Sequence, residues 1–163
     1  MPALARLLTA GAAVAALAVQ PAVSAPAPQG ILAASGRGVF ILDGDAAVLG
    51  VARGPALIVV QDRAGDAMLR VGGRVVRPVR TRPGSPFVTV RRIRLGDVRR
   101  RFLVSGSNIR LRVESADMTL NASGRFRVRL TGQGSYTVDD GAPQTWVAGA
   151  TVKVGLARQR RRG

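Results

Sequence analysis

The chain has 163 residues, 47% of them hydrophobic, and contains neither cysteine nor histidine. The absence of these two residue types excludes Ser-His-Asp and Cys-His catalysis, disulfides, and zinc, copper or haem sites built on His or Cys. The formal net charge is +16, from 25 Lys and Arg against 9 Asp and Glu, which predicts attraction to polyanions.

The first 25 residues predict a secretory signal peptide. Arg6 and the amino terminus supply positive charge, and residues 7–19 form an apolar stretch. These 13 residues fit a signal core and are too few to cross a bilayer core of about 30 Å. Val23 and Ala25 are the small residues that signal peptidase requires. Pro26 directly after Ala25 leaves open where the chain is cut, and whether the segment remains as an anchor.

Residues 26–30 are predicted to be a spacer, residues 31–157 one domain, and residues 158–163 a disordered basic tail. No second apolar run is long enough for a transmembrane helix. The signal segment therefore predicts an exported protein that is periplasmic, on the cell surface or secreted.

The first half of the domain, about residues 31–76, shows brief apolar runs between glycines. Candidate strands are residues 39–42, 47–51, 57–61 and 68–71. Residues 57–60, Leu-Ile-Val-Val, lack polar alternation and predict a strand buried on both faces, or an edge strand that joins a partner. A proline-rich connection over residues 77–86 leads to a second half, about residues 87–155, in which a change of apolar phase predicts a bulge at Arg91 and Arg92.

Apolar residues alternate with polar ones most regularly in this second half. Four runs begin at Ile109, Met118, Phe126 and Tyr136, at intervals of 9, 8 and 10 residues, with Ser, Gly, Asn or Asp between them. Regular short strands of this kind predict an antiparallel β-sandwich or barrel. The expected fold is thus a single all-β domain of many short strands, preceded by a signal-peptide helix.

Residues 105–138 also resemble the short-repeat β-solenoid domains of adhesin-like envelope proteins. The resemblance rests on the Ser-Gly turns and on the segments ADMTLNASG and RVRLTG, which cover residues 116–124 and 127–132. It implies that each strand is one rung and that successive rungs stack in parallel. A β-solenoid is therefore the alternative architecture.

Two acidic groups are candidate calcium ligands. They are Asp43 with Asp45, and Asp139 with Asp140, each next to a glycine. Neither matches an EF-hand loop, and Asp-Gly sequences are typical of β-turns, so we expect turns at both places and no metal site. We expect no cofactor and no catalytic residue, although a hydrolase that uses carboxylates alone stays a competing hypothesis.

The candidate site is a set of arginines. If Ile109 and Phe126 begin runs that face the core, the alternating arginines face outward at intervals of about 6.7 Å. A second cluster precedes them in the chain. The predicted anion-binding residues are Arg110, Arg112, Arg125, Arg127 and Arg129, together with Arg91, Arg92 and Arg94.

These features predict a non-enzymatic binding or structural protein of the bacterial cell envelope. The expected partner is an anionic envelope polymer or a lipid headgroup, bound by guanidinium groups. Nucleic acid is disfavoured because aromatic residues make up only 4% of the chain and an exported protein meets little of it. The alternative is an exported subunit that assembles with another protein through edge strands.

Overall fold

The computed structural model describes residues 29–76, 79–80, 89–96 and 98–155. The predicted signal segment and the predicted basic tail lie outside them. The described residues form nine strands: β1 (Gly30–Arg53), β2 (Ala56–Asp62), β3 (Met68–Val71), β4 (Arg74–Val75), β5 (Val79–Arg80), β6 (Thr89–Leu95), β7 (Arg100–Val138), β8 (Gln144–Thr145) and β9 (Thr151–Val154).

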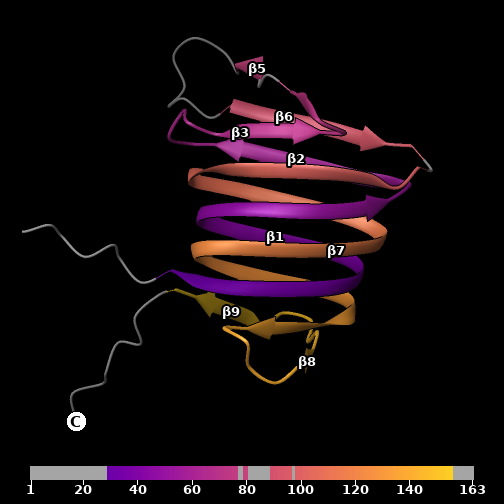
Figure 1. The fold of residues 1–163 in the computed structure, drawn as a ribbon, viewed down its shortest axis with the longest axis vertical. Helices are drawn as coiled ribbons and strands as arrows, with labels where there is room; N and C mark the ends of the chain where they lie inside the picture. The colour runs from indigo at the N-terminus through magenta and orange to yellow at the C-terminus, as the bar shows by residue number, and fades with distance from the viewer. Residues whose placement is uncertain (1–28, 77–78, 81–88, 97, 156–163) are drawn as a thin grey trace, which may run out of the picture.

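Two very long strands, β1 and β7, wind around a common axis as stacked turns (Figure 1). β1 lies between successive turns of β7 and pairs antiparallel with both. Phe40, for example, is opposite Val113 on one side and Leu130 on the other, so one turn of β7 takes 17 residues at this point. β1 and β7 come from the two predicted halves of the domain, and they build one sheet.

The shorter strands extend this coil at its two ends. On one side of the molecule the strands lie in the order β6, β2, β7, β1, β7, β9. On the opposite side the order is β4, β3, β7, β1, β7, β1, followed by the last turn of β7. The curled antiparallel sheet confirms the all-β prediction. The parallel stacking implied by the solenoid resemblance is wrong, because β1 separates the turns of β7.

The core lies inside the coil and consists of every second residue of the strands. Phe40, Phe102 and Phe126 are 0–1% exposed and come from β1 and from two turns of β7. Leucine, isoleucine and valine side chains fill the space between them, including Leu42, Ile58, Ile109, Leu111 and Leu120. The period-2 pattern of residues 109–138 thus identified the buried face correctly.

The predicted turns within this segment are corners of one continuous strand. Glycines meet there across the sheet: Gly36 pairs with Gly134, and Gly38 with Gly132. A Cβ atom built at Gly36 would collide with the carbonyl oxygen of Gln133, and Gly36 and Gly38 have φ angles of 155° and 130°. Glycine is the residue that combines such backbone angles with so close an approach.

Three predictions about the segments that form β2 and β6 are wrong. β2 is not an edge strand, because it pairs with β6 on one side and with β7 on the other. Its burial alternates: Ile58 and Val60 are buried, whereas Leu57 and Val59 are half-buried on the outer face. The β2–β6 register is unbroken, so no bulge occurs at Arg91 and Arg92.

We expect Gly44→Ala to destabilise the fold by at least about 2 kcal/mol. Gly44 has a φ of 144°, and an added Cβ would collide with the carbonyl oxygen of Arg125 and lie 2.8 Å from the Cα of Phe126. The control is Gly96→Ala, where an added Cβ meets no atom within 4 Å. Urea unfolding measures both, and equal stability of the two variants would contradict the proposed role of the corner.

Candidate anion-binding face

The outer surface of the sheet formed by β6, β2, β7, β1 and β9 is here called the arginine face. Arg110 is half-exposed, and Arg112, Arg125, Arg127 and Arg129 are exposed, since the residues between them are buried. β6 and β9 add exposed cations beside them, because directly opposed residues of a sheet project to the same side. The arginine face contains Arg92, Arg94, Arg110, Arg112, Arg125, Arg127, Arg129 and Lys153.

The sheet register arranges the cations of this face in rows that run across the strands. In one row Arg92, Arg112 and Arg129 follow one another at every second strand, with Val59 and Ile41 between them. Two strand spacings separate successive arginines of this row by about 9.5 Å. The separation is set by backbone pairing and not by the flexible side chains.

The next row brings two cations together. Arg127 of β7 is directly opposite Lys153 of β9. The sequence analysis did not include Lys153 in the candidate site. The alternation in Thr-Val-Lys-Val over residues 151–154 indicates an outward lysine, but not which strand lies beside it.

In the row of Arg92, Arg112 and Arg129, the residues between the arginines are apolar and only half-buried. Ile41 of β1 and Val59 of β2 are examples. Arginine buries its aliphatic stem along apolar surface while its charged head stays in water. Val59 lies directly opposite Arg92 on one side and Arg112 on the other, so it offers both aliphatic stems an apolar surface.

Three acidic residues neutralise part of the face. Asp43 lies 3.7 Å from Arg63 and 3.8 Å from Arg110. Glu114 lies 3.1 Å from Arg112 on the same strand. All these side chains are about one third to one half exposed, so each ion pair stabilises the fold by about 0–1 kcal/mol.

Asp45 holds another ion pair and a backbone contact. One of its oxygens lies 3.3 Å from Arg125, and the other accepts a hydrogen bond from the amide of Asn108 at 2.9 Å. Asp43 and Asp45 therefore lie within a strand corner and not in the predicted turn. The predicted turn at Asp139 and Asp140 is confirmed, since the amide of Gly141 donates to the carbonyl of Val138.

Five cations of the arginine face have no carboxylate within 4.0 Å among the described residues. They are Arg92, Arg94, Arg127, Arg129 and Lys153. The backbone of Arg91 pairs with Val60, and the side chain of Arg91 lies outside the described residues. The face thus keeps a surplus of positive charge after its ion pairs are counted.

The carboxylates of the described residues do not gather into a metal-binding group. No three acidic side chains gather where they could hold a metal ion within the described ranges. Hydrogen bonds from the side chain and the backbone of Ser107 hold the pKa of Asp66 below its usual range. The part of the chain that the structure describes also lacks a helix long and apolar enough to cross a membrane.

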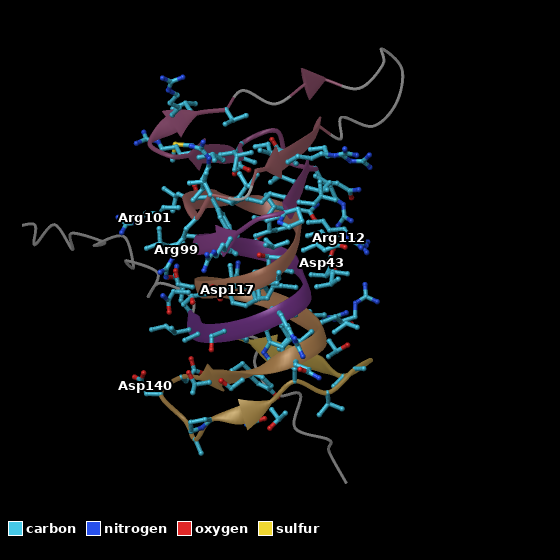
Figure 2. All side chains as sticks on the ribbon, turned by 90° about the vertical axis from the view of Figure 1, so that its right-hand side faces the viewer. Asp43, Arg99, Arg101, Arg112, Asp117 and Asp140 are labelled. Atoms are coloured by element: carbon cyan, nitrogen blue, oxygen red, sulfur yellow. The ribbon has the colours of Figure 1, made fainter. Side chains whose placement is uncertain are left out.

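Figure 2 shows charged residues on two sides of the molecule. Asp43 and Arg112 lie on one side, and Arg99, Arg101, Asp117 and Asp140 lie on the other. No protein-family model, curated protein sequence or solved structure matches this chain. The functional argument therefore rests on the geometry of these surfaces.

We expect Asp43→Asn to increase the affinity of the protein for inorganic polyphosphate two- to five-fold. The substitution frees Arg63 and Arg110 from their shared carboxylate. Asp117→Asn, on the opposite side, makes the same change in net charge and is the control. Isothermal titration calorimetry measures both, and an equal gain in the two variants would show that only the total charge matters.

Proposed function

We propose that this chain is an exported, non-enzymatic binding or structural protein of the bacterial cell envelope. Its arginine face binds a linear anionic polymer. The observation that supports this proposal is the group of five cations without a carboxylate partner, spread over β6, β7 and β9 on one side of the sheet.

The spacing of these cations favours a repeating ligand. Arg127 and Arg129 lie about 6.7 Å apart along their strand. Within one row, successive cations lie about 9.5 Å apart across the strands. Guanidinium groups form paired hydrogen bonds with phosphate and carboxylate oxygens. An extended polymer with one such anion per repeat can contact several of these groups at once, whereas a single small anion contacts one or two.

A binding role also fits what the face does not contain. Asp43, Asp45 and Glu114 each lie beside an arginine. Neither histidine nor cysteine exists in the chain to act as a nucleophile or base. Retention of a polymer by charge requires no such group.

The sequence of residues 1–25 supports the export part of the proposal. Expression of the whole chain in a bacterium should place it outside the cytoplasm, with an N-terminus at or near residue 26 if the segment is cleaved. Fractionation followed by mass spectrometry measures this. A chain found only in the cytoplasm would overturn export without affecting polymer binding.

The polymer proposal predicts a steep dependence of binding on salt. Five phosphate contacts should give a slope of log K against log salt of about −3.5 to −4.5. Arg127→Gln with Arg129→Gln should reduce the size of this slope by about 1.4–1.8 and weaken binding. The probes are linear polyphosphate and poly(glycerol phosphate), measured by fluorescence anisotropy.

The matched control is Arg53→Gln with Arg74→Gln, which removes the same charge outside the arginine face. It should keep both the slope and most of the affinity. Equal losses in the two double variants would contradict a defined site. Binding to phosphatidylglycerol vesicles but to neither polymer would assign the face to lipid headgroups, and stronger binding to a single-stranded oligonucleotide would assign it to nucleic acid.

A further inference from the structure

The side of the sheet opposite the arginine face is apolar and hydroxyl-rich, and is here called the neutral face. It is formed by β3, β7 and β1, with β4 above them. One row of directly opposed residues runs Arg70, Leu103, Leu49, Asn121, Ala33 and Thr137, and the next runs Met68, Ser105, Ala47, Ser123 and Ile31. Charged side chains occur only at the ends of these rows.

Most of the exposed large apolar side chains lie on this face. Ile31 is 51% exposed, Leu49 45% and Met68 39%, and Val75 of β4 is 59% exposed opposite Arg70. Two others are known among the described residues, Val98 and Val147, and they lie outside these rows. A shallow hollow of about 250 Å³ between Ile31, Leu49 and Leu103 marks the middle of the face.

The two ends of the neutral face have opposite charge. Arg70 and Arg101 lie at the end near β3 and are exposed. Asp139 and Asp140 follow the last turn of β7 at the other end, where a carboxylate oxygen of Asp139 accepts a hydrogen bond from the amide of Ile31 at 2.7 Å. Figure 2 shows Arg99 and Arg101 nearer one end of this side and Asp140 nearer the other.

We propose that the neutral face binds the neutral face of a second copy of this chain, with the two coil axes antiparallel. A two-fold axis between Leu49 and Asn121 then places the basic end of each copy on the acidic end of its partner. It also places Leu103 of one copy over Ala33 of the other. Contacts of this kind occur twice and close the dimer.

The basic end and the acidic end of the neutral face complement each other, which favours a second copy of this chain as the occupant. Each chain has a formal charge of +16, so two copies that meet through their arginine faces repel each other. The neutral face is the described surface where two copies can pack apolar groups and match acidic with basic ends. Six strands at their usual spacing give the neutral face a width of about 24 Å.

The dimer leaves both arginine faces exposed on opposite sides. It is independent of the proposed polymer binding, because neither Arg127 nor Arg129 takes part in it. A polymer-binding dimer would bridge two polymer chains, whereas a dimer that binds no polymer would still satisfy this inference. The tests below therefore contain no polymer.

Analytical ultracentrifugation of the mature chain should show a monomer–dimer equilibrium. Leu49→Glu should weaken the dimer at least ten-fold, because it buries an uncompensated carboxylate beside the two-fold axis. The control is Val147→Glu, which adds the same charge at a side chain that is 60% exposed and outside the rows. Circular dichroism and thermal unfolding like those of the unmodified protein establish that each variant folds.

The orientation has its own test. Asp140→Arg and Arg101→Asp should each weaken the dimer, and the two together should restore part of the lost affinity. Recovery in the double variant supports the antiparallel arrangement, and its absence overturns that arrangement. A chain that stays monomeric at every concentration overturns the dimer, as does a Leu49→Glu variant that associates as well as Val147→Glu.

Discussion

Two strands of 24 and 39 residues coil around one core because glycines stand where their backbones approach most closely. Gly30 meets Gly124, Gly36 meets Gly134, and Gly38 meets Gly132, each pair directly opposed across the sheet. An added Cβ would collide with a carbonyl oxygen of the neighbouring strand at Gly36, Gly38, Gly124, Gly132 and Gly134, and with the backbone nitrogen of Gly155 at Gly30. The coil brings distant segments together, and the core and both outer faces depend on it.

In the described residues, alternation along the strands divides the side chains into an inner set and an outer set. On the side that runs from β6 to β9, directly opposed residues project to the same face, so the inner set is continuous across these strands. The charge of the outer set depends on the residues that each strand segment places on its outer face. β6, β7 and β9 supply cations on one side, whereas β1, β3 and a different part of β7 supply small and apolar groups on the other. Charge segregation is therefore a consequence of where each strand crosses a corner.

The sequence was sufficient for the fold class and for the buried alternation of residues 109–138, because both depend on local period. It was not sufficient for the path of the chain. The turn residues Ser115, Ser123 and Gly132 looked like hairpin signals but lie within one strand, since corner and hairpin require the same small residues. The outward arginines followed from alternation alone. Lys153 beside Arg127, and the carboxylates beside Arg110 and Arg125, depend on long-range pairing that no local pattern encodes.

The enclosure of β1 between two turns of β7 also has a consequence for how the chain acquires its structure. Leu32 pairs with Ala122 and with Val138, so at this point both edges of β1 pair with segments that follow it by 90 or more residues in the chain. Few contacts join neighbours in sequence, and such topologies fold slowly because distant segments must meet before any pairing is rewarded. Until then β1 is an unpaired strand with both edges open, which is the state in which chains most readily associate wrongly.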